Sequence, residues 1–270
     1  MGKSKTLDLQ KYSLGAIPEE VFGCAKAEEL IISSDAVMDK ESVYLDEEFW
    51  WEVGFDNNGI GKIPDAIGEL VHLRRIEAAQ NYISFISPDI GKLQDLEYLD
   101  LCNNYLTYFP LGITKLKNLK ILNLNYNSIQ SLPPEIRNME SLQELHLNSN
   151  QLTELPPEIG KLKNLRVLDL GNFDPDKIYA ETRERFDLTM NTLSSLPEEF
   201  GDLKNLEFLD LSFNKFTEPP ECMTRLVNLQ ECIFRGNCFH NEAKWLLDEF
   251  EYHQRPAPIW WYHYQDAPWE

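Results

Sequence analysis

A 23-residue period constrains the fold of this chain more than any other feature. Leucine returns at steps of 23 through the middle of the chain, at Leu73, Leu96, Leu119, Leu142 and Leu165. The same register extends back to Ser4, Ala27 and Trp50 and, after one interruption, forward to Leu206 and Leu229. A unit this short cannot bury its leucines alone, so the period predicts a solenoid in which each coil packs on its neighbours.

The repeat at residues 142–164, LQELHLNSNQLTELPPEIGKLKN, shows how one coil is built. Leu142, Leu145 and Leu147 give the spacing LxxLxL, which predicts a short strand with one buried face. Asn150 follows at a turn, where an amide can bond to the backbone of adjacent coils. The same column holds Asn58, Asn81, Asn104, Asn127, Asn191, Asn214 and Asn237. We therefore expect a buried asparagine ladder with a structural role.

The second half of the same repeat turns away from the strand. Pro156 blocks a continuing strand, because its ring fixes φ and it has no N–H to donate. Ile159 and Leu162 are expected to point inward from a short helical or 3-10 stretch, which ends at Gly160.

The motif LxxLxLxxNxLxxLPxxIGxLxN resembles the leucine-rich repeat family in its 23-residue cytosolic form. Within that family the chain is similar to plant Ras-group-related proteins, Ras-scaffold proteins and bacterial leucine-rich repeat proteins. The resemblance implies an α/β horseshoe with a concave parallel sheet of about ten strands and short helical, 3-10 or irregular convex segments. It also implies a protein-binding or peptide-binding module without a cofactor.

The register predicts ten coils within a solenoid covering residues 1–251. The second coil, residues 27–49, lacks the Leu-Pro signature and is expected to form a helix on its outer half. An 18-residue insertion is expected at 171–188, either as a tolerated surface excursion or as a wall beside the binding face. A helix at about 241–251 is expected to cap the core, and the aromatic tail at 252–270 either packs on that cap or is an exposed docking segment.

The strand positions that point away from the core form the candidate binding site. The third position of the repeat gives an apolar and aromatic stripe, the fifth gives an acidic one, and the eighth adds further aromatic rings. The candidate partner-binding residues are Tyr98, Asp100, Ile121, Asn123, Tyr126, His146, Val167, Asp169, Phe208, Asp210 and Phe213. Aromatic side chains beside charge are typical of binding surfaces, so we expect a basic, partly apolar protein or peptide as the partner.

Composition limits which partners and which cellular compartment we expect for this chain. The net charge of −20 argues against nucleic acid and against anionic membrane surfaces, which both require basic residues. Five cysteines without a CxxC pair indicate free thiols in a reducing, cytoplasmic compartment. The spacing of Cys222, Cys232, Cys238 and His240 does not match a zinc module, so no metal site is expected.

The sequence does not favour an enzyme. His146, between Asn123 and Asp169, is the one candidate cluster, and it would lie on an open sheet without a serine or cysteine nucleophile. Asp100 and Asp169 would be three strands apart, about 14 Å, which is too far for a carboxylate pair to act together.

Two alternative functions stay open. One is a regulator or scaffold in small-GTPase-type signalling, which the resemblance suggests. The other is an N-myristoylated, membrane-anchored adaptor, because Gly2 and Thr6 fit the loose acylation pattern.

Overall fold

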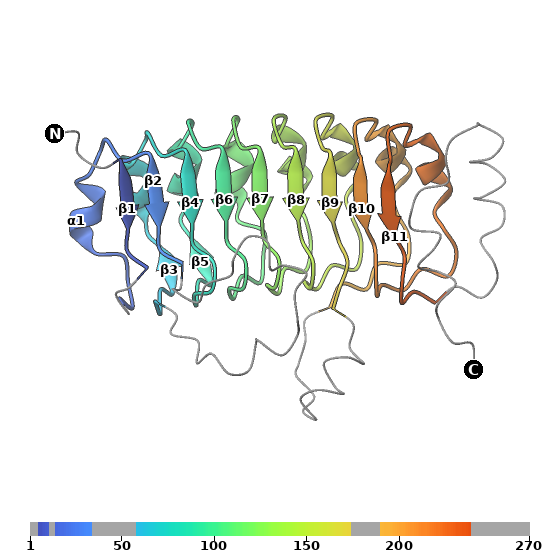
Figure 1. The fold of residues 1–270 in the computed structure, drawn as a ribbon, viewed down its shortest axis with the longest axis horizontal. Coiled ribbons are helices and arrows are strands. Elements are labelled where there is room, and N and C mark those ends of the chain that lie inside the picture. The colour runs from blue at the N-terminus through green and yellow to red at the C-terminus, as the bar shows by residue number, and fades with distance from the viewer. Residues whose placement is uncertain (1–4, 11–13, 34–57, 174–189, 239–270) are drawn as a thin grey trace, which may run out of the picture.

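The computed structural model describes residues 5–10, 14–33, 58–173 and 190–238. Within these residues a nine-stranded parallel sheet forms one side of a solenoid, and 3-10 helices lie on the other (Figure 1). The strands of this sheet are β1 (Thr6–Asp8), β2 (Glu29–Ile31), β4 (Arg75–Glu77), β6 (Tyr98–Asp100), β7 (Ile121–Asn123), β8 (Glu144–His146), β9 (Val167–Asp169), β10 (Phe208–Asp210) and β11 (Glu231–Ile233). The predicted leucine-rich repeat architecture is confirmed.

The remaining elements follow the strands within each coil. Near the N-terminus, α1 (Glu19–Phe22) is a single helical turn, and β3 (Lys62–Ile63) pairs with β5 (Phe85–Ile86) in a second, two-stranded sheet. The 3-10 helices are η3 (Asp65–Glu69), η4 (Pro88–Lys92), η5 (Leu111–Lys115), η6 (Pro134–Asn138), η7 (Pro157–Lys161), η8 (Glu198–Asp202) and η9 (Glu221–Arg225).

Prolines set the start of these helices. Six of the seven begin directly after a proline, at Pro64, Pro110, Pro133, Pro156, Pro197 and Pro220. Ile159 and Leu162 are fully buried, as predicted. Gly160 lets η7 lie close to η8, because a Cβ at this residue would lie only 2.1 Å from the carbonyl oxygen of Glu199. The alternation of strand and 3-10 helix therefore encloses one continuous leucine core.

The predicted asparagine ladder connects successive coils. The Asn104 side chain donates to the carbonyl oxygens of Ala78, one coil earlier, and Leu101, in its own coil, at 2.9 and 3.0 Å. Its side-chain oxygen accepts from the Ile83 N–H at 2.9 Å. Asn127, Asn150 and Asn214 repeat this pattern. Each buried amide therefore satisfies backbone groups that neither sheet nor helix pairs.

The prediction of ten coils is wrong, because the second and third predicted coils are one. Strand β2 pairs directly with β4, so no strand lies between them. Asn58 donates to the carbonyl oxygens of Ile32 at 2.9 Å and Ser33 at 3.1 Å, as Asn104 does within its own coil. Asn58 therefore belongs to the coil that starts at Ala27. The extra residues in that coil number one full period, so counting in steps of 23 could not reveal them.

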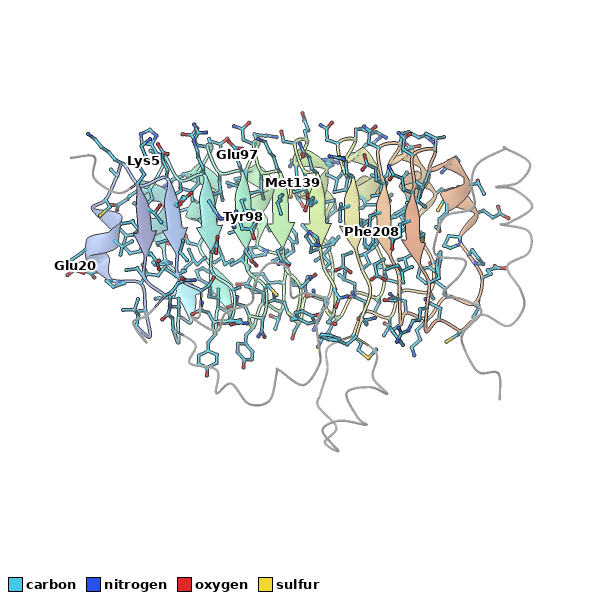
Figure 2. The ribbon with its side chains drawn as sticks, viewed as in Figure 1. Lys5, Glu20, Glu97, Tyr98, Met139 and Phe208 are labelled. Atoms are coloured by element: carbon cyan, nitrogen blue, oxygen red, sulfur yellow. The ribbon has the colours of Figure 1, made fainter. Side chains whose placement is uncertain are left out.

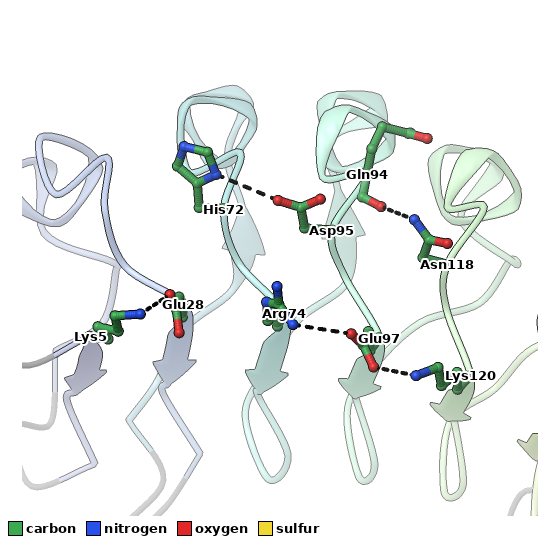
Figure 3. A network of polar contacts seen from close by, with 9 residues as sticks. All are labelled: Lys5, Glu28, His72, Arg74, Gln94, Asp95, Glu97, Asn118 and Lys120. Carbon is green, nitrogen blue, oxygen red and sulfur yellow. Dashed lines mark hydrogen bonds and ion pairs between the residues drawn. The ribbon is translucent and has the colours of Figure 1, made fainter.

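Charged side chains at the second repeat position give independent support for this order of coils. Lys5 pairs with Glu28, and Glu97 pairs with both Arg74 and Lys120 at 3.6 and 2.5 Å (Figure 3). The Arg74 N–H donates to the carbonyl oxygen of Glu28 at 2.7 Å. The charges thus alternate in sign from coil to coil only when the Arg74 coil follows the Glu28 coil. These pairs are exposed, so each adds little to stability.

In the coil that starts at Leu165, the repeat continues to Asn172, two residues further than predicted. The Ser149 N–H donates to the carbonyl oxygen of Gly171, and the Asn172 N–H donates to that of Ser212. Asn191 then takes the ladder position, so the chain departs from the repeat after Asn172. The rest of the insertion (174–188), the expected helix in 34–49, the cap helix at 241–251 and the tail at 252–270 lie outside the described residues.

Candidate functional site

Strand pairing places the predicted binding residues in two parallel rows. The third-position row is Tyr98, Ile121, Glu144, Val167 and Phe208, and the fifth-position row is Asp100, Asn123, His146, Asp169 and Asp210. All are half-buried, whereas the fourth-position residue of each strand is buried in the core. We call the surface formed by these ten residues the open sheet face. Figure 2 shows Tyr98 on β6 and Phe208 on β10, at the two ends of the first row.

Tyr98 is fixed in place at the N-terminal end of the open sheet face. The Arg75 guanidinium lies 3.5 Å from the centroid of its ring, and Arg75 also pairs with Glu77 at 2.6 Å. The Tyr98 hydroxyl donates to Asp100 Oδ2 at 3.3 Å, and burial raises the pKa of this tyrosine. Contacts within the protein therefore hold the Tyr98 ring in one position.

Asp169 is the most heavily bonded acid of the fifth-position row. It accepts from the side chains of Asn148 and Asn125 at 3.3 and 3.5 Å and from the Gly171 N–H at 3.2 Å. Burial nevertheless raises its pKa, with His146 acting in the opposite direction. Asn125 and Asn148 occupy the seventh repeat position and were not among the predicted site residues. The sequence signal that could have identified them is the amide at the seventh position of two successive coils.

Asp210 lies on the strand next to Asp169 and shares its environment. Burial, followed by the negative charge of Asp169, raises the pKa of Asp210 to about 7. Its Oδ1 accepts from the Ser212 N–H at 2.7 Å. A positive charge beside these two adjacent carboxyl groups would favour their ionised forms and lower their pKa values.

The eighth-position rings are engaged within the protein itself. Tyr126 and Phe213 both have left-handed backbone conformations, with φ of 55° and 52°. The Tyr126 ring stacks on Phe173 with centroids 5.0 Å apart, and the Arg235 guanidinium lies 5.1 Å from the centre of the Phe213 ring. Tyr126 and Phe213 therefore border the open sheet face with their rings already packed.

Asp100 and Asp169 are too far apart to act together as a carboxylate pair. Asp100 is paired with Asn123, Asn123 with His146, and His146 with Asp169, so Asp100 and Asp169 are three strands apart as predicted. His146 Nε2 lies 3.5 Å from Glu144 Oε2, and this contact lowers the pKa of Glu144.

A second group of exposed aromatic side chains was missed at the sequence level. Tyr82, Phe85, Tyr105 and Tyr108 are exposed and lie in two neighbouring coils, beyond the ladder asparagines. They fall on repeat positions ten and thirteen, which are polar or small in most other coils. A comparison of those two columns between coils would have revealed them.

The regular stacking of strand and 3-10 helix defines a solenoid repeat protein. A family model described as a leucine-rich repeat region matches residues 61–184, and one described as a leucine rich repeat matches residues 205–226. The chain therefore belongs to the leucine-rich repeat family. No curated protein sequence matches it.

Solved structures share this fold at low sequence identity. The Arabidopsis receptor kinase HAESA, solved with the peptide hormone IDA and the co-receptor SERK1, is 22% identical over 86% of this chain and 38% of its own, with a TM-score of 0.57. The Arabidopsis thaliana receptor kinase GASSHO1/SCHENGEN3 is 24% identical over 82% of this chain and 26% of its own, with a TM-score of 0.54. Internalin C2 of Listeria monocytogenes is 22% identical over 68% and 71%, with a TM-score of 0.53. This chain thus spans well under half of either plant receptor, and these likenesses show the fold alone.

No helix among the described residues is long and apolar enough to span a membrane. In the same ranges, no group of three or more histidine, cysteine, aspartate or glutamate side chains is placed to hold a metal ion.

Proposed function

We propose that this protein is a non-enzymatic interaction module that binds a basic, partly apolar protein or peptide on the open sheet face. The observation that carries the proposal is the pair of rows between β6 and β10, one largely apolar and one largely acidic. Leucine-rich repeat proteins typically mediate protein–protein interactions, and HAESA was solved with a bound peptide hormone. That precedent supports protein or peptide binding in general, and the choice of the open sheet face rests on the residues of its two rows.

The dimensions of the face suit an extended segment. Four strand spacings separate β6 from β10, which is roughly 19 Å at about 4.8 Å per step. An extended chain covers about 3.3 Å per residue, so roughly six residues of a partner would cross the two rows. Tyr98 and Phe208, at the ends of the apolar row, would contact the apolar side chains of that segment.

The acidic row would select for positive charge. Asp169 and Asp210 are adjacent; burial raises the pKa of both, and the charge of Asp169 raises the pKa of Asp210 further. A lysine or arginine side chain between them would stabilise both carboxylates and would lower their pKa values. Binding should therefore strengthen as the pH rises through about 7 and weaken as salt is added.

The test starts with affinity capture of partners by the whole chain. The captured partner is then measured against a variant carrying Tyr98→Ser and Phe208→Ser. The matched control carries Val71→Ser and Val227→Ser, which remove two exposed apolar side chains outside the open sheet face. We expect at least a tenfold loss of affinity in the first variant and none in the control. Equal affinity for all three proteins would remove the proposal.

The two alternative functions gain no supporting observation from the described residues. Regulation of a small GTPase would appear as nucleotide-dependent capture by this chain. Myristoylation at Gly2 would appear as an added acyl mass on the natural N-terminus. The proposed cytoplasmic location rests on the five cysteines, all of which are described and unpaired.

A further inference from the structure

Four exposed aromatic side chains outside the open sheet face lie on two neighbouring coils, and we call them the aromatic patch. Tyr82, Phe85, Tyr105 and Tyr108 are 49%, 43%, 58% and 47% exposed. The rings of Tyr82 and Tyr105 occupy the same repeat position and have centroids 5.6 Å apart. Phe85 and Tyr108 share a second position in the same two coils.

Most side chains around the patch are uncharged, and a charged one, Lys62 on β3, pairs with Phe85 on β5. The neighbouring exposed or half-exposed positions in these coils and the next are Ser84, Thr107, Ser128, Gln130 and Ser131. On a chain with a net charge of −20, a surface with four rings and no acidic side chain among these neighbours stands apart. Exposed apolar patches of this kind usually mark a surface that something covers.

The chain itself supplies a segment whose two ends lie beside this patch. Residues 34–57 connect Ser33 to Asn58, and the Asn58 side chain donates to the Ser33 carbonyl oxygen at 3.1 Å. Two residues further on, the carbonyl oxygen of Ile60 accepts from the N–H of Tyr82 at 3.0 Å. Both ends of the segment are therefore anchored in the coil next to the patch.

The sequence of this segment contains apolar residues that the sheet does not accommodate. The 23-residue register would place Trp50, Val53 and Phe55 in a strand, at the core-facing positions of a coil. The direct pairing of β2 with β4 leaves no place for that strand. Burial of these side chains, together with Phe49 and Trp51, against another apolar surface would be favourable.

We propose that the aromatic patch is a docking surface for the apolar residues 49–55 of this same chain. Fifteen residues separate Ser33 from Phe49, which allows a reach of up to roughly 50 Å, far more than one coil spacing. The four rings of the patch suit their aromatic side chains, because docking removes apolar surface on both sides from water. This inference concerns a different surface from the open sheet face and does not depend on the proposed function.

Tryptophan fluorescence of the full chain tests the inference. The reporter protein keeps Trp50 and Trp51 and carries phenylalanine at the other four tryptophans, Trp245, Trp260, Trp261 and Trp269. Quenching by acrylamide is compared between this protein and a patch variant with serine at Tyr82, Phe85, Tyr105 and Tyr108. The control variant carries Val71→Ser and Val227→Ser, and far-UV circular dichroism verifies the fold of each.

We expect the reporter to emit at short wavelength and to resist quenching, and the patch variant to be quenched about threefold more readily. The control should match the reporter, and none of the values should change on dilution. The inference is overturned if Trp50 and Trp51 are fully quenchable in the reporter or if the patch variant behaves like the control. An effect that disappears on dilution would instead assign the patch to a second copy. If the fourfold variant does not fold, Tyr105→Glu alone supplies the same comparison at the most exposed ring.

Discussion

Replacing one ladder asparagine tests the physical basis of the coil stacking. Asn127 is buried, donates to the carbonyl oxygens of Leu101 and Leu124 at 3.0 and 3.1 Å, and accepts from the Leu106 N–H at 3.0 Å. Asn127→Ala removes two donated bonds, worth about 1 kcal/mol each, and leaves a buried N–H without a partner, which costs about 1–3 kcal/mol. We therefore expect the free energy of unfolding to fall by about 3–5 kcal/mol.

Asn118 offers a matched control for this substitution. It is exposed, and its side chain makes a single bond between coils, donating to the Gln94 carbonyl oxygen at 2.8 Å (Figure 3). Asn118→Ala should cost less than about 1 kcal/mol. Urea unfolding followed by circular dichroism measures both. Equal midpoints for the two variants would refute the account of the ladder.

Three further predictions concern packing, coil order and charge. Gly160→Ala should destabilise the protein by about 1–3 kcal/mol in urea unfolding, because the added methyl would meet the Glu199 carbonyl oxygen, whereas Gly61→Ala has open space and should cost much less. Deleting residues 35–57 shortens the second coil to one repeat length of 23 residues. We expect the deletion variant to retain cooperative unfolding and the far-UV circular dichroism spectrum of the wild type. Loss of both would show that the sheet needs these residues. In the folded protein the pKa of Asp210 is about 7, above its ordinary value of 3.8. The folded state binds this proton more tightly than the unfolded state does, so the free energy of unfolding falls as the pH rises from about 4 to about 7. Asp210→Asn should therefore be more stable than the wild type at pH 8, with the difference shrinking towards pH 5, and a constant difference would contradict the raised pKa.

The repeating parts of this protein could be predicted because one set of interactions recurs in every coil. A leucine at the fourth position, an asparagine at the ninth and a proline before the 3-10 helix act through local geometry, so their columns determine the strand, the ladder and the turn. The two rows of the open sheet face follow from the same register. Their pairing from Tyr98 to Phe208 was therefore predictable from the sequence.

The number of coils could not be obtained in this way. The period assigns each residue a position from 1 to 23 within its repeat. An extra stretch of 23 residues therefore leaves the assigned position of every later residue unchanged. The pairing of Glu29–Ile31 with Arg75–Glu77, together with the contacts of Asn58 and of Arg74, shows which coils are neighbours. The contacts of Asn125 and Asn148 with Asp169, and of Tyr126 with Phe173, also depend on residues one or two coils apart.

The equilibrium affinity of a captured partner for an acid-row variant tests the central claim most directly. Asp169→Asn with Asp210→Asn preserves the shape of the open sheet face and removes its adjacent charges. We predict at least a tenfold loss of affinity at pH 8 and low salt, a smaller loss at high salt, and no change for the Val71→Ser and Val227→Ser control. Unchanged affinity in the acid-row variant would show that the partner binds elsewhere or needs no charge on this face.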